Sequence, residues 1–186
     1  MGVKKAVKKG ARAAKTAART KASPENIRKL KESIEKHRRE GKYEHFESVA
    51  DEDIQKMLTR SNTPFFSSWG WSNTTPGGTF NLSVNVFNPD PVAVGSMYVH
   101  TFIGLALAAV SNDTALLAVD ARWNRLAEPQ FFGMSLASST SGNVSFTVAA
   151  PATIERSNYF GNLFLIRRGS GVASVLDRQS YVFRVT

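Results

Sequence analysis

The chain has 186 residues, which is enough for one ordinary domain and an appendage. It contains no cysteine, which excludes disulfide bonds, thiolate metal sites and a cysteine nucleophile, and which fits an intracellular protein. The net charge of +9 is unevenly placed: residues 1–46 hold 15 Lys and Arg against 5 Glu, whereas residues 47–186 hold 9 against 10 acidic residues.

The first segment, residues 1–22, is predicted to be a basic, flexible arm. It has eight Lys and Arg, no acidic residue and no Leu, Ile, Phe, Trp or Tyr, so like charges repel and nothing apolar is available to pack. Nothing in it is arranged to read base edges, so we expect sequence-independent binding of nucleic acid or another polyanion. The residues expected to contact phosphates are Lys4, Lys5, Lys8, Lys9, Arg12, Lys15, Arg19 and Lys21. A solubilising tail is the alternative, and membrane binding is not expected for an arm without a large apolar face.

A helical linker region is predicted over residues 23–61. Ser23 and Pro24 are typical of a helix start, and Gly41 of a helix end. A second short helix is expected at about residues 51–60, with acidic residues in its first turn. The first helix carries a narrow apolar stripe that could dock on a partner or form a coiled-coil seam, made of Ile27, Leu30 and Ile34.

From residue 62 to residue 186 the pattern predicts an all-β domain. Turn residues separate short stretches in which apolar and polar side chains alternate, and no long helical pattern appears. Phe80, Leu82 and Val84 alternate with polar residues, which indicates a half-buried strand, and residues 159–167 are apolar on both faces, which indicates a central strand. The other strands are expected at 65–71, 96–104, 115–123, 131–137, 143–150 and 180–185. This spacing predicts an antiparallel β-sandwich, with Ig-like and jelly-roll strand orders both open.

An aromatic cluster lies at the start of this domain. Its members are Phe65, Phe66, Trp69 and Trp71. Packing of the linker against the core and a contact between subunits are the favoured roles. A stacking platform for nucleic-acid bases is the alternative.

Several features follow one another between residues 80 and 167. They are a strand that ends in Asn88-Pro89, the alternating stretch from Val144 to Val148, then Pro151, and Tyr159 before a hydrophobic strand. With these features the domain resembles the Ig-like sandwiches of bacterial adhesion-related modules. The resemblance covers about half of the chain and implies an Ig-like fold. Separately, a basic arm ahead of a β-sandwich is similar to the layout of small icosahedral viral coat proteins. Neither resemblance supplies catalytic residues.

The sequence offers little for catalysis, metal binding or a cofactor. His37 and His45 are expected to be solvated in the charged helical region, and His100 is expected to have a structural role in a strand. No nucleophile elbow, phosphate-binding loop or close metal-ligand cluster is present in the sequence. We therefore expect a protein that is not an enzyme.

Two functions remain open from the sequence. The first is a structural or assembly protein, in which a coat-like sandwich forms a homo-oligomer or larger assembly and the arm binds nucleic acid. The second is an Ig-like interaction module that is anchored to a partner through its helical N-terminus. With no signal peptide or transmembrane segment recognised, the expected location is intracellular or within a virus-like particle.

Overall fold

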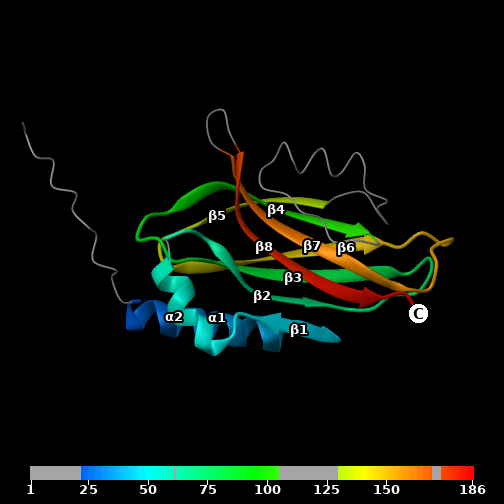
Figure 1. Cartoon of the computed structure of the whole chain (residues 1–186), viewed down its shortest axis with the longest axis horizontal. Coiled ribbons are helices and arrows are strands. Elements are labelled where there is room, and N and C mark those ends of the chain that lie inside the picture. The colour runs from blue at the N-terminus through cyan, green and yellow to red at the C-terminus, as the bar shows by residue number, and fades with distance from the viewer. Residues whose placement is uncertain (1–21, 61, 105–129, 169–172) are drawn as a thin grey trace, which may run out of the picture.

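The computed structural model describes residues 22–60, 62–104, 130–168 and 173–186 (Figure 1). Two helices are present in this part of the chain, α1 (Pro24–Glu40) and α2 (Asp51–Arg60), and both were predicted at these positions. The strands are β1 (His45–Ser48), β2 (Phe65–Trp71), β3 (Thr79–Asn88), β4 (Val94–Gly104), β5 (Gln130–Leu136), β6 (Thr140–Ala149), β7 (Asn158–Arg168) and β8 (Ala173–Arg184). The predicted strand at 115–123 and the eight basic residues of the arm lie outside the described residues.

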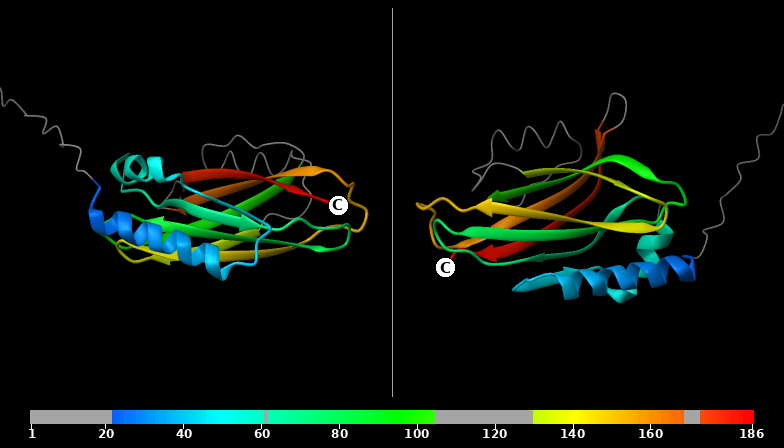
Figure 2. Two further views of the ribbon diagram at one scale, coloured as in Figure 1. Left: turned by 90° about the horizontal axis from the view of Figure 1, so that it is seen from below. Right: turned by 180° about the vertical axis from the view of Figure 1, so that it is seen from behind.

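The strands form two antiparallel sheets that pack face to face. The first sheet has the order β1-β2-β3-β6 and the second has the order β5-β4-β7-β8. Both helices lie on the side of the first sheet that faces away from the second sheet, as Figures 1 and 2 show. The molecule is therefore a helix layer on a two-sheet sandwich, and the prediction of an all-β sandwich preceded by short helices is confirmed.

The strand order is Ig-like and settles the choice that the sequence left open. In Ig-type sandwiches the first two strands pair, the fifth strand pairs with the second, and the last two strands pair with each other and with the third. When β2 is counted as the first strand, the same pairs are present: β2 with β3, β3 with β6, β4 with β7 and β7 with β8. The remaining strand, β5, joins the edge of the second sheet next to β4. The jelly-roll alternative is therefore set aside.

The main core fills the space between the sheets and is rich in aromatic rings. Phe80 of β3 lies between Tyr181 and Phe183 of β8, with ring centroids 5.9 and 4.4 Å away. Strand β7 is central, as predicted, because it pairs with β4 on one side and β8 on the other. Its middle residues, from 161 to 166, are all buried, which explains why both faces of this stretch are apolar in sequence.

Side chains join the two sheets along the side where β2 and β8 meet. The indole Nε1 of Trp71 donates to the carbonyl of Val182 at 2.9 Å, and the backbone N–H of Phe66 donates to the carboxylate of Asp177 at 2.8 Å. Phe66 precedes a bulge in the pairing of β2 with β3, so its N–H is available for a partner outside the sheet. This side of the sandwich is therefore closed by hydrogen bonds.

Two features of the first sheet differ from the sequence-based expectation. Residues 45–48 were not predicted as a strand, yet β1 pairs with β2 and forms the edge of the sheet. The polar residues Ser83 and Asn85 of β3 were expected to face solvent, but both are buried because α1 covers them. The predicted domain boundary at residue 62 falls between α2 and β2, and the segment before it contacts the sandwich directly.

Candidate docking site of the N-terminal helix

Helix α1 lies across the outer face of the first sheet and contacts β2, β3 and β6 (Figure 2). This contact is called the helix interface below. Its residues recur at intervals of three and four, so they fall on one face of the helix. The chain enters α1 directly from the basic arm, so this interface decides where the arm leaves the sandwich.

The half of the interface near the start of α1 is apolar. Leu30 has no exposed surface, Ile34 is 6% exposed and Ile27 is half-buried. The partners that pack with them come from α2, β2 and β3 and are Ile54, Leu58, Phe65 and Phe87. Burying a Leu or Ile side chain contributes about 1.5–3 kcal/mol. The apolar stripe predicted from the sequence is therefore covered by the chain itself.

The other half of the interface is a hydrogen-bonded polar network. The hydroxyl of Ser33 contacts the side-chain oxygen of Asn85 at 2.9 Å and the hydroxyl of Ser141 at 2.6 Å. One turn further, the imidazole of His37 has Nδ1 at 2.8 Å from the hydroxyl of Ser68 and Nε2 at 3.0 Å from the hydroxyl of Ser83. These contacts provide the buried hydroxyl and amide groups of the sheet with partners.

The prediction that His37 is solvated is wrong, since its side chain is 1% exposed. Burial lowers the pKa of His37 to about 4, because the charged imidazolium would lose its hydration. The ring is therefore neutral at pH 7, with one nitrogen as donor and one as acceptor for the two serines. The rings of Tyr43 and Phe46 complete its surroundings, with centroids 5.3 and 5.5 Å away. The sequence signal was the spacing, because residue 37 continues the stripe of residues 27, 30 and 34.

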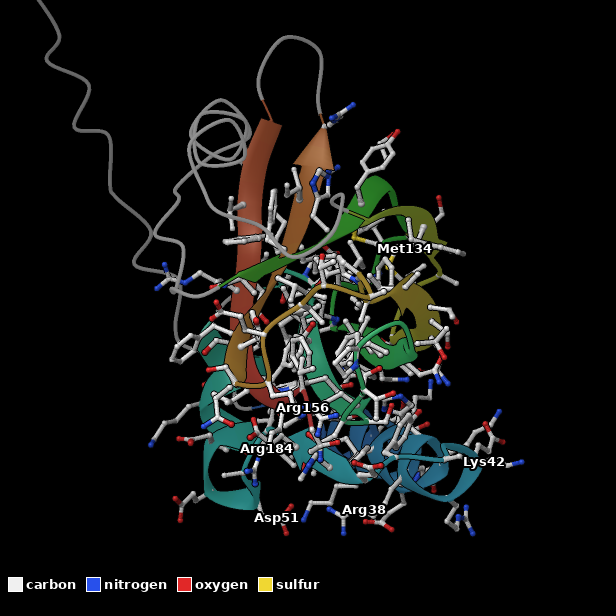
Figure 3. The ribbon with its side chains drawn as sticks, turned by 90° about the vertical axis from the view of Figure 1, so that its right-hand side faces the viewer. Arg38, Lys42, Asp51, Met134, Arg156 and Arg184 are labelled. Carbon is white, nitrogen blue, oxygen red and sulfur yellow. The ribbon has the colours of Figure 1, made fainter. Side chains whose placement is uncertain are left out.

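The exposed face of α1 carries charges of both signs. Arg28 bridges Glu25 at 2.8 Å and Glu32 at 2.6 Å, and Lys31 reaches Asp51 at the start of α2, 3.1 Å away. A hollow of about 330 Å³ lies between α1 and the segment that leads from the end of β1 to the first residue of α2, and it is lined by basic and acidic residues alike. In Figure 3 the side chains of Arg38 and Asp51 point away from the sheets. The positive charge of the arm is thus not continued as a basic stripe along this helix.

The seven residues predicted to contact a partner are placed as follows. Leu30, Ile34 and Phe65 are buried in the helix interface, and Ile27 lies at its border. Phe66, Trp69 and Trp71 belong to the main core between the sheets. All four aromatic residues are at most 6% exposed, so none of them offers a free ring face to a nucleic-acid base. The packing role considered for this cluster accounts for its position, whereas a contact with another subunit stays a prediction.

Among the residues that the structure describes, no group of three or more histidine and carboxylate side chains could hold a metal ion. His45 is exposed and stacks on Trp71, and His100 is buried in β4. Neither described helix has the length and apolar character needed to cross a membrane.

No family model matches the sequence, and no curated protein matches it. Among solved structures, it is similar to the CARDB domain of a Pyrococcus furiosus protein in complex with di-metal ions, with a TM-score of 0.42, 12% identity, and 67% of this chain and 86% of that one covered. The C-terminal domain of Wzt is similar with a TM-score of 0.41 and 15% identity, and the match covers 61% of this chain and 63% of that domain. A Bacteroides uniformis β-glucuronidase is similar with a TM-score of 0.46 and 12% identity, and the match covers 67% of this chain and 13% of the enzyme. This chain therefore spans only a small part of that enzyme.

Proposed function

We propose that this protein is a non-enzymatic building block of a larger assembly, with a coat-like layout, whose N-terminal arm binds nucleic acid or another polyanion. The observation that carries the proposal is the separation of charge. Residues 1–22 hold eight Lys and Arg without one acidic residue, whereas residues 47–186 hold 9 basic and 10 acidic residues. A polycationic arm binds phosphates through counterion release, and the nearly neutral body remains available for contacts with other protein molecules.

The helix interface supports this proposal because it gives the arm a fixed origin. Leu30, Ile34 and His37 hold α1 on the sandwich, and Ala22 packs against the same apolar cluster. An arm that starts at a fixed point projects its charges from one place on each copy. In an assembly of many copies, all arms can then reach the same side, where one polyanion neutralises them together.

The test compares three forms of the protein by size-exclusion chromatography with light scattering and absorbance at 260 and 280 nm. They are the full chain, a form lacking residues 2–21, and a full-length form with the eight basic residues changed to Gln. Because Ala22 contacts the apolar cluster, the truncation stops before it. We expect nucleic acid to elute with the full chain at low salt and with neither variant. Eight phosphate contacts on duplex DNA predict a log–log salt slope of roughly −7.

The Gln form is the matched control, since it keeps the length and composition of the arm apart from its charge. Retention of nucleic acid by this form would contradict electrostatic binding through the arm. A full chain that is free of nucleic acid at low salt and does not bind added DNA or RNA would overturn the proposed role of the arm.

A further inference from the structure

A long segment without charged residues includes two adjacent edge strands of the sandwich. Residues 129–154 contain no Asp, Glu, Lys, Arg or His, although 21% of the chain is charged. This segment includes β5, at the edge of the second sheet, and β6, at the edge of the first sheet. The two strands contact each other, so they form one side of the sandwich. A run of 26 uncharged residues over two edges is unusual for a surface, because edge strands are normally protected by charge.

The opposite side of the sandwich shows that protection. Strand β8 forms the other edge of the second sheet and carries Asp177, Arg178 and Arg184. Strand β1 forms the other edge of the first sheet, is only four residues long and contains His45 and Glu47. Short edges and charged side chains both prevent pairing with another chain. The difference between the two sides therefore indicates that the β5–β6 side is built for contact.

Strand β6 has the properties that pairing with a further strand requires. It is ten residues long and pairs with β3 at ten consecutive positions without a bulge. Within the described ranges its pairing is with β3 alone. The side chains of Ser145, Thr147 and Ala149 are exposed on the outer face. On the neighbouring β5, Phe132 is 46% exposed beside Phe146, with ring centroids 6.5 Å apart.

We propose that β6 pairs antiparallel with β6 of a second copy of this chain, so that the first sheets of the two copies become one continuous sheet. A two-fold axis places each strand opposite an identical strand. A charged residue near such an axis would face the same charge on the partner strand, which destabilises the pairing of the two strands. Strand β6 contains no charged residue. Phe132 lies beside the same edge, where a second copy would cover it. The inference rests on the proposed function, since it names the contact between building blocks.

Sedimentation of the full-length protein, treated with nuclease and held at high salt, measures this contact separately from the arm. We expect a dimer whose dissociation constant rises at least tenfold in the Ser145→Lys, Thr147→Lys double variant. The matched control places the same charges on β8, at the exposed Ser174 and Ser180, and should leave the dimer unchanged. A monomer at all concentrations, or equal effects of the two double variants, would overturn the pairing. Nucleic-acid binding at low salt, read from the absorbance ratio, reports on the arm alone.

Cysteine substitution gives a second test that does not depend on destabilising the strand. The chain has no cysteine, so each single variant has one thiol. Residues close to the two-fold axis bring their Cα atoms within disulfide range, about 4.4–6.8 Å. We expect at least one of Ser145→Cys, Thr147→Cys and Ala149→Cys to form a disulfide-linked dimer under mild oxidation, and Ser180→Cys to form no disulfide-linked dimer. Absence of a linked dimer in all three β6 variants would also overturn the proposal.

Discussion

The hydroxyl group of Tyr159 donates a hydrogen bond to the backbone carbonyl of Glu155, 2.9 Å away. Tyr159 is the second residue of β7, which corresponds to the sixth strand of an Ig-type sandwich. A tyrosine at this place, bonded to the backbone a few residues upstream, is the tyrosine corner of Ig-like folds. It fixes the crossing from the first sheet to the second. The strand order and this corner are independent observations that agree on the Ig-like fold.

Replacing Tyr159 by Phe should lower the free energy of unfolding by about 1 kcal/mol, the net contribution of one intramolecular hydrogen bond. The ring itself stays, packed against Phe183 with centroids 5.7 Å apart, so the core is unchanged. Urea denaturation of the two proteins measures the difference. Tyr98→Phe on the half-buried ring of β4 serves as a comparison and should change the unfolding free energy less. Equal losses in the two variants would contradict a specific corner.

His37 should make the stability of the protein depend on pH. Its pKa in the folded protein is about 4 against 6.5 in an unfolded chain, so the unfolded state binds the proton more tightly. The contribution of the neutral ring is complete above pH 6.5, falls as the pH drops from 6.5 towards 4, and then stays constant. Between pH 6.5 and pH 5 the loss is about 2 kcal/mol, at 1.36 kcal/mol for each pH unit. Urea denaturation at several pH values measures it.

The control for this prediction is His37→Gln, because glutamine keeps a donor and an acceptor but does not titrate. This variant should be less stable than the wild type at pH 7.5 and should lose less stability between pH 6.5 and pH 5. Glu40 and Arg38 are near His37 on α1, and they are present in both proteins, so their contributions cancel. Equal pH dependence of the two proteins would contradict the assignment to His37.

The sequence was sufficient to predict the helices and strands whose apolar pattern reflects packing against one core. Strand β2 was predicted with its observed bounds and α1 to within one residue, because turn residues and a Ser-Pro helix start delimit them. The central position of β7 followed from its apolar residues on both faces. The alternation of apolar and polar residues in β3 was recognised, but the polar residues were wrongly expected to face solvent. Ser83 and Asn85 are buried by a helix that lies far away in sequence, which local alternation does not reveal.

Other features depend on contacts between distant segments. Strand β1 has only four residues and is stabilised by its pairing with β2, so its local sequence carries no strand signal. His37 was assigned to the solvent because it lies in a charged helical region, although the helical spacing places it on the buried face of α1. Of the candidate site, the apolar stripe was therefore predictable, whereas its polar continuation needed the position of the sheet.

Replacing Leu30 by Ala should destabilise the helix interface, because this side chain is fully buried among residues of α2, β2 and β3. A change from a fully buried Leu to Ala costs about 2–5 kcal/mol. Hydrogen exchange should show the amides of α1 exchanging faster than those of β7, since the helix detaches before the sandwich unfolds. The comparison is Lys29→Ala, whose exposed ion pair with Glu25 contributes less than about 1 kcal/mol. Slower exchange in α1 than in β7 would contradict the predicted order.

Gly161 of β7 lies under the ring of Tyr181 on β8, and a Cβ atom there would be 1.9 Å from its Cζ. Tyr181 is 2% exposed and its hydroxyl contacts that of Thr101 at 3.2 Å, so the ring has no room to move. Gly161→Ala should therefore cost about 3 kcal/mol through overpacking.

A double-mutant cycle with Tyr181→Val tests the cause of this cost, because removing the ring also removes the clash. In the Val background the cost of Gly161→Ala should fall by at least about 1 kcal/mol, and calorimetry or urea denaturation of the four proteins gives the coupling energy. Gly133→Ala on β5 is the matched control, since a Cβ there would be 3.5 Å from Tyr98, an ordinary contact. Alanine restricts the unfolded chain, so this control should be neutral or slightly stabilising. Additive effects in the cycle would show that the backbone of Gly161, and not the Tyr181 ring above it, demands glycine.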